Sequence, residues 1–187
     1  FLHYFLYLND SKIISKKCFI YASDIFFRGI PNWLINFSER EDMKIMKSDV
    51  NTEKEYPTVD FVVHLATIAS PIFYRQHPIE TMDANVFGLR NLLEHSLKNP
   101  ISGFLYFSTS EIYGDPDSLN IPTKEDYRGN VSCTGPRACY DESKRFGETL
   151  CINFSNVHSI PIKIVRPFNN YGPGLSINDG RVVPDFF

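Results

Sequence analysis

The clearest chemical pattern in this sequence is a tyrosine four residues before a lysine, Tyr140 and Lys144 in the segment CYDESKR. On a helix this spacing places both side chains on one face, one turn apart. A lysine ammonium beside a phenol stabilises the phenolate and so lowers the pKa of the tyrosine. Such a phenol can take the proton of a sugar hydroxyl while a nicotinamide accepts the hydride from the same carbon. The pair therefore indicates the acid–base dyad of a redox reaction.

The Tyr-x-x-x-Lys spacing alone is weak evidence, because a chain rich in both residue types produces it by chance. Its weight comes from two further segments, STSEIYGDP at residues 108–116 and RPFNNYGPG at residues 166–174. Both segments begin where a short apolar run ends, as functional loops do when they follow a strand.

The elements that must position these residues alternate between strands and helices. Short runs of β-branched, aromatic and other apolar residues predict strands at Cys18–Ala22, Val59–Leu65, Gly103–Ser108 and Ile162–Arg166. Apolar residues at helical spacing predict helices at Pro78–Lys98 and Tyr140–Asn156. This alternation predicts an α/β fold with a doubly wound parallel sheet of the Rossmann-like kind.

Polar residues follow every predicted strand, which is where such a sheet binds its ligands. Asp24 follows the first strand, and residues 66–70, 108–111 and 167–170 follow the others. The sequence therefore places its candidate site at the carboxyl edge of the sheet.

The composition excludes several classes of protein. The net charge is −3 and no run of Lys or Arg could follow a phosphate backbone, so we expect no nucleic-acid binding. The four cysteines show no metal-binding spacing, which predicts free thiols in a reducing compartment, the cytoplasm, and no metal site. The opening FLHYFLYL is too short to span a bilayer, so we expect a buried helix there and no membrane contact.

A glycine-rich turn after the first strand, which normally receives a dinucleotide pyrophosphate, is missing, because the first glycine is Gly29. We therefore expect that both ends of the chain are cut and that the turn is encoded upstream of Phe1. The first predicted strand is then the second strand of a dinucleotide-binding sheet. Its terminal Asp24 suits the ribose hydroxyls of NAD, and the alternative is that Asp24 only ends the strand in a turn.

Taken together, the segments resemble the extended short-chain dehydrogenase/reductase family of nucleotide-sugar enzymes, and most of all its UDP-glucuronate decarboxylases. The matching segments are HLATIASP (64–71), the helix with Asn85, STSEIYGDP, YRGNVSCTGPRACYDESKR (127–145), RPFNNYGP (166–173) and NDGRVV (178–183). Related dehydratases resemble Thr-Asp-Glu where this chain has Thr109, Ser110 and Glu111, and 4-epimerases typically lack the glutamate. The triplet therefore resembles the decarboxylase pattern.

The resemblance implies a mechanism with NAD as a recycled cofactor. Tyr140, assisted by Lys144, would deprotonate the sugar 4-hydroxyl, to which Thr109 would donate or accept a hydrogen bond. The 4-ketone would allow carbon dioxide to leave, and Glu111 would handle the proton at C5. The expected cofactor-binding residues are Asp24, Ile25, Phe26, Gly29, Asp49, Val50, Leu65, Ala66, Ser70, Ser108, Tyr140, Lys144, Asn170 and Arg181, and the expected substrate-binding residues are Asn85, Ser110, Asn169 and Arg181.

The resemblance further implies a partial NAD-binding domain at residues 1–168, the truncated start of a substrate domain at 169–187, and a homodimer formed through the Tyr140–Lys144 helix. One departure is Asp83, because the decarboxylases carry a basic residue there that would meet an acidic sugar. Two alternatives therefore stay open: a 4-epimerase or 4,6-dehydratase acting on a neutral nucleotide sugar, and a non-catalytic fragment. Among the polar residues, His64 ends an apolar strand and is predicted to be a core histidine.

Overall fold

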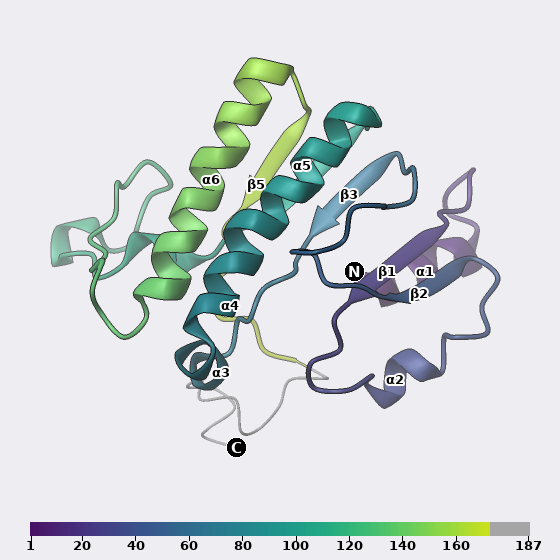
Figure 1. Cartoon of the computed structure of the whole chain (residues 1–187), viewed down its shortest axis with the longest axis horizontal. Coiled ribbons are helices and arrows are strands. Elements are labelled where there is room, and N and C mark those ends of the chain that lie inside the picture. Colours follow the sequence, from purple (N-terminus) through teal and green to yellow (C-terminus); the bar gives the residue numbers. More distant parts are fainter. Residues whose placement is uncertain (173–187) are drawn as a thin grey trace. The chain divides into compact units, whose positions relative to one another are not determined.

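A computed structural model describes residues 1–172 of the chain, and these form two compact units that are treated separately below. The N-terminal unit comprises Phe1–Asp49 and the C-terminal unit begins at Val50. Each contains parallel strands with helices, so the predicted α/β class is confirmed (Figure 1).

The N-terminal unit is built on a pair of parallel strands. β1 (Ile20–Asp24) pairs with β2 (Met43–Lys47), and helices α1 (Leu2–Ser11) and α2 (Asn32–Ile35) complete the unit. Leu6, Leu34 and Met43 form its core. β2 was not predicted, because the two lysines in MKIMK interrupt the apolar pattern of a strand covered on both faces.

Asn9 fixes the end of α1 against β1. Its side chain is 2% exposed, donates to the Cys18 carbonyl (2.8 Å) and to the Asp42 carboxylate (2.9 Å), and accepts from the Cys18 N–H (2.8 Å). The predicted helix at FLHYFLYL is thus confirmed. The prediction of its burial is wrong in part, since Tyr4 and Tyr7 are exposed and only Leu6 and Asn9 are buried in α1.

The C-terminal unit contains a parallel sheet in the order β3-β4-β5, with β3 at Phe61–His64, β4 at Gly103–Phe107 and β5 at Ile162–Val165. Its longer helices, α5 (Leu89–Lys98) and α6 (Ala138–His158), lie side by side in front of these strands (Figure 1). Shorter elements are α3 (Pro71–Gln76), α4 (Pro78–Asp83) and the 3-10 helices η2 (Ser110–Tyr113) and η3 (Ser118–Asn120).

The core of this unit joins the sheet to the two long helices. Leu89 and Leu93 of α5 meet Phe104 and Tyr106 of β4 and Cys151 of α6. Gly147 permits this close packing, because a Cβ there would lie 2.1 Å from the Tyr106 hydroxyl oxygen. The helix that carries the candidate site is therefore packed directly against the sheet.

The helix predicted at Pro78–Lys98 is present as three consecutive segments. Between α4 and α5 lies η1, one turn of π-helix at Ala84–Gly88. Such turns are frequent at functional sites. The predicted domain boundary at residues 168/169 stays a prediction, because residues 173–187, including Arg181, lie outside the described part of the chain.

No helix in the described part of the chain is long and apolar enough to cross a membrane. Within residues 1–172 no three His, Cys, Asp or Glu side chains are grouped as metal ligands would be. All four cysteines are free thiols, as predicted.

Candidate active site

Tyr140 and Lys144 lie in the first turns of α6, and Lys144 reaches the carboxyl end of β4. Both are buried, with 7% and 1% exposure. The Lys144 ammonium donates to the Phe107 carbonyl at 2.7 Å and lies 5.9 Å from the centre of the Tyr140 ring. The predicted sharing of one helix face is therefore confirmed, and the face is turned toward the strand that carries the TSE triplet.

Burial changes the electrostatics of this dyad. Removal from water lowers the pKa of Lys144 to about 7, because the charged form loses its hydration. The lysine is therefore partly neutral at physiological pH unless a ligand or the tyrosine phenolate stabilises its charge. The tuning expected from the sequence assumed an ammonium that is fully charged.

The TSE triplet follows β4 directly and begins η2. The Thr109 hydroxyl accepts from the Glu111 N–H (3.3 Å), and the Ser110 N–H donates to the Pro167 carbonyl (3.0 Å). The Ser108 hydroxyl is buried and has no hydrogen-bond partner among the described residues. Backbone contacts to the end of β5 thus fix this segment beside the dyad.

Glu111 forms an ion pair with Arg137, the residue that immediately precedes α6. The two side chains keep 28% and 40% of their surface exposed, so the pair borders on solvent. This bond brings the predicted proton-transfer residue to the helix that carries Tyr140. Sequence reasoning missed Arg137, although its position three residues before Tyr140 was a usable signal.

Tyr74 is a second residue that the sequence did not reveal. It lies in α3 with 1% exposure, and its ring stacks on that of Tyr140 with centroids 5.2 Å apart and planes inclined by 13°. The Cys139 thiol also donates to its carbonyl. Tyr74 thereby restricts the orientation of the Tyr140 ring.

Asn85 lies in η1 and is completely buried. Its amide nitrogen donates to the Ser143 hydroxyl at 2.9 Å, while its amide oxygen has no partner among the described side chains. The bond ties η1 to α6 immediately before Lys144. The expected contact of Asn85 with substrate stays a prediction.

Other predicted contacts of this unit lie at strand ends. Leu65 and Ala66 are exposed directly after β3, Val50 is half-buried, and Ser70 is buried at the start of α3. Asn169 and Asn170 are exposed after β5. His64 is a core histidine, as predicted: it stacks on Tyr106, and burial together with the charge of Lys144 lowers its pKa to about 3.

The remaining predicted cofactor residues belong to the N-terminal unit. The Asp24 carboxylate accepts from the Phe26 N–H at 2.6 Å in the turn after β1, and its ribose role stays a prediction. Ile25 is 49% exposed, Phe26 and Gly29 have positive φ, and Asp49 is half-buried.

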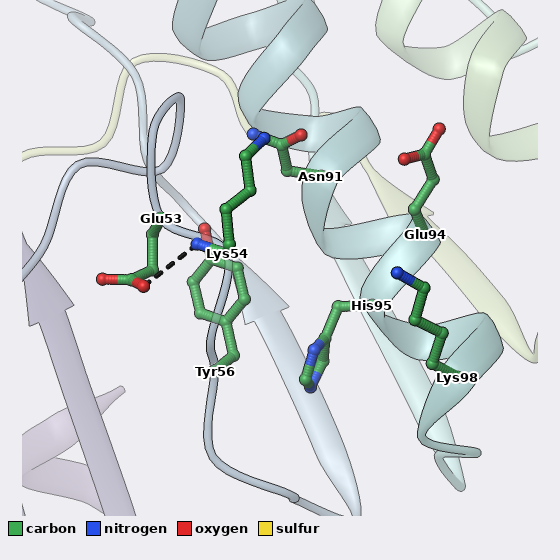
Figure 2. A pocket seen from close by; sticks show the side chains of 7 residues that line it. All are labelled: Glu53, Lys54, Tyr56, Asn91, Glu94, His95 and Lys98. Carbon is green, nitrogen blue, oxygen red and sulfur yellow. Dashed lines mark hydrogen bonds between the residues drawn. The ribbon is translucent and has the colours of Figure 1, made fainter.

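A small hollow of about 80 Å³ lies elsewhere in the C-terminal unit, between α5 and the segment before β3 (Figure 2). It is lined by Glu53, Lys54, Tyr56, Asn91, Glu94, His95 and Lys98. Asn91 donates to the carbonyls of Val50 and Asn51, which fastens the segment to the helix. None of the predicted site residues lines this hollow.

Gly114 closes the turn that holds Glu111, and its replacement by alanine is expected to disturb the site. Its φ is +63°, and a Cβ there would lie 2.0 Å from the Asn130 carbonyl oxygen. Because the Asn130 backbone cannot move aside without disturbing its neighbours, Gly114→Ala should destabilise the protein by about 1–3 kcal/mol and displace η2. The measurement is thermal unfolding of the full-length protein together with its activity. Gly135→Ala is the control, since a Cβ there meets only the Ser132 side chain at 3.3–3.4 Å and a backbone oxygen at 4.0 Å; equal effects of both variants would refute the argument.

In doubly wound parallel sheets ligands bind at the carboxyl ends of the strands, and the Tyr–Lys pair and the TSE triplet belong to that edge in this unit. The model of the NAD dependent epimerase/dehydratase family matches residues 32–187. The chain belongs to this family, and the family's cofactor is NAD.

Individual relatives agree with this assignment. UDP-glucuronic acid decarboxylase 6 of Arabidopsis thaliana is 41% identical over 180 residues, which cover 96% of this chain and 51% of that protein. The chain therefore spans about half the length of this relative.

Solved structures show the same fold. The UDP-N-acetylglucosamine 4-epimerase from Methanobrevibacter ruminantium M1 has a TM-score of 0.78 at 24% identity, covering 96% of this chain and 55% of that one. The UDP-glucuronic acid 4-epimerase from Bacillus cereus, solved in complex with NAD, has a TM-score of 0.69 at 22% identity, covering 94% and 56%. At these identities the likeness concerns the fold alone.

Proposed function

We propose that the full-length protein is an NAD-dependent nucleotide-sugar decarboxylase that converts UDP-glucuronate to UDP-xylose through a 4-keto intermediate. The observation that carries the proposal is the position of Glu111, which Arg137 holds at the start of the helix that bears Tyr140. The 41% identity to a UDP-glucuronic acid decarboxylase supports it further.

The described residues fit a bound nicotinamide nucleotide. Lys144 has three N–H donors, and the hydrogen bonds described for it use one, to Phe107, so its other donors suit ribose hydroxyls. The partnerless Ser108 hydroxyl and the exposed Leu65 and Ala66 line the same strand ends. The chemistry that NAD supplies when bound is reversible acceptance of a hydride from a carbon that bears a hydroxyl group.

In the proposed reaction, Tyr140 and Glu111 carry out the proton transfers and Thr109 positions the sugar. Tyr140 takes the proton of the 4-hydroxyl, and Thr109 positions that hydroxyl by a hydrogen bond. With a ketone at C4, the C5–C6 bond breaks, carbon dioxide leaves, and the electron pair of that bond passes to the ketone oxygen to form an enolate. Glu111, an ionised carboxylate in its pair with Arg137, takes up a proton from water and passes it to C5, and Tyr140 returns its proton to the 4-oxygen.

A second candidate is a 4-epimerase or 4,6-dehydratase that acts on a neutral nucleotide sugar. Asp83 favours it, because a half-buried carboxylate at the end of α4 repels an acidic sugar. Ser110 disfavours the dehydratase activity, because a serine hydroxyl cannot serve as the acid that expels the 6-hydroxyl at neutral pH.

The test is release of labelled carbon dioxide from UDP-glucuronate by the full-length protein with NAD. We expect carbon dioxide and UDP-xylose in equal amounts without net reduction of NAD. Turnover of UDP-glucose with no carbon dioxide from UDP-glucuronate would instead establish the second candidate. No turnover of either sugar would favour a non-catalytic protein.

We further propose that the protein is a cytoplasmic homodimer that pairs through α6. Phe146, Ile152 and Val157 of α6 are 50–72% exposed, and Phe87 of the adjoining η1 is 60% exposed. A second copy would remove these apolar side chains from water. Sedimentation of the full-length protein at twice the monomer mass is the expected result, and a monomer at micromolar concentration would exclude it.

A further inference from the structure

Arg137 faces two carboxylates and not one. It forms an ion pair with Glu111, and its Nε lies 3.7 Å from Oδ2 of Asp141, one turn further along α6. Asp141 directly follows Tyr140 in the sequence. The arginine therefore links the predicted proton-transfer residue to the turn of helix that carries the tyrosine.

We propose that Asp141 is a positioning residue that acts through Arg137 to hold the Glu111 carboxylate in place beside Tyr140. This inference rests on the proposed function, in which Glu111 delivers a proton at C5. Asp141 itself does not touch the reacting atoms.

Burial makes Asp141 suited to this role. The residue is 8% exposed, and its Oδ1 has no hydrogen-bond partner among the described residues. A buried carboxylate without other partners depends on the nearby guanidinium for compensation of its charge. That dependence restricts the arginine, which would otherwise be a long and flexible side chain at the edge of the site.

The same burial gives the arrangement a pH dependence. Loss of hydration raises the pKa of Asp141 to about 6, although Arg137 opposes the shift. The charged and titratable groups that face it are Arg137 just before α6, Cys139 and Glu142 of α6, Asp115 of the loop after η2, and Tyr74 of α3. Above pH 6 the ionised Asp141 attracts Arg137, and below pH 6 this attraction is lost. Activity is therefore expected to fall as the pH drops through about 6.

The test compares Asp141→Asn with Glu142→Gln in the full-length protein, using the nucleotide sugar that the wild type turns over. The Glu142→Gln substitution removes the same charge one position further along the helix, but Glu142 pairs with Arg145 and not with Arg137. We expect Asp141→Asn to lower kcat at pH 7.5 about tenfold with KM within about twofold, and to abolish the change of rate near pH 6. Glu142→Gln should retain the wild-type rate at pH 7.5 and still lose activity at acidic pH, with the change moved to slightly lower pH because the Glu142 charge helps to raise the pKa of Asp141.

A double-mutant cycle identifies the route of the effect. Arg137→Lys keeps the charge but cannot reach both carboxylates in the same geometry, so it should also remove the change near pH 6. If Asp141 acts through Arg137, Asp141→Asn adds nothing to Arg137→Lys. Additive losses, or an Asp141→Asn protein that matches Glu142→Gln, would overturn the proposal. If the Asp141→Asn protein does not fold, the Arg137→Lys protein alone tests the proposal. An Arg137→Lys protein whose rate still changes near pH 6 would refute it. Absence of carbon dioxide release by the wild-type protein would contradict the proposed function. The comparison of variants tests the role of Asp141 separately, because it uses whichever nucleotide sugar the wild type turns over.

Discussion

Replacing Tyr140 by phenylalanine is expected to reduce carbon dioxide release from UDP-glucuronate by about 10²–10⁴-fold, the usual contribution of a positioned acid–base group. The variant keeps the ring that stacks on Tyr74 at 5.2 Å, so the local packing should survive. What it loses is the phenol that takes the proton of the 4-hydroxyl. The loss should therefore appear in kcat, with the affinity for the nucleotide sugar nearly unchanged.

Tyr106→Phe is the matched control for this experiment. It removes a phenol hydroxyl from the same region, since the Tyr106 ring lies 5.1 Å from the Lys144 ammonium. The Tyr106 hydroxyl is buried without a partner among the described residues, so its removal should be neutral or slightly stabilising. A Tyr140→Phe protein as active as Tyr106→Phe would mean that Tyr140 is not the base.

The sequence was most informative where one residue pattern decides the structure. β3, β4 and β5 were predictable because their runs are nearly continuously apolar, as strands covered on both faces require. β2 escaped prediction because two of its five residues are lysines. The π-helical turn η1 also escaped, because nothing in the residue types of ANVFG distinguishes a π-helical turn from an α-helical one.

In the site, the sequence revealed residues that lie close together along the chain and missed those joined by the fold. The Tyr140–Lys144 spacing could be recognised within one helix. The stacking of Tyr74 on Tyr140 and the pairing of Glu111 with Arg137 join segments far apart in sequence, and no local pattern encodes them. The burial of Lys144 was equally invisible, although it determines the charge of the dyad.

That burial leads to the second large prediction, that Lys144→Met strongly lowers activity while it stabilises the fold at low pH. The activity should fall about 10²–10⁴-fold, because Tyr140 loses its cationic neighbour. Stability changes through the buried charge. The pKa of Lys144 is about 7 in the folded protein and near 10.5 when unfolded, so the cost of burying the ammonium is fully present below pH 7 and disappears as the pH rises to 10.5.

Methionine fills a similar volume without a charge, so the variant avoids this cost. We expect it to be more stable than the wild type by about 1–3 kcal/mol at pH 6. The difference should shrink toward pH 9–10 and then reverse, because the variant also lacks the 2.7 Å hydrogen bond to the Phe107 carbonyl. Thermal unfolding of the full-length protein at pH 6, 7.5 and 9 measures the trend. Lys163→Met, at an exposed position of β5, should show no such dependence. A Lys144→Met protein that is less stable than the wild type at pH 6 would mean that the buried ammonium is fully compensated by its surroundings, and the lysine would then be charged throughout the working pH range.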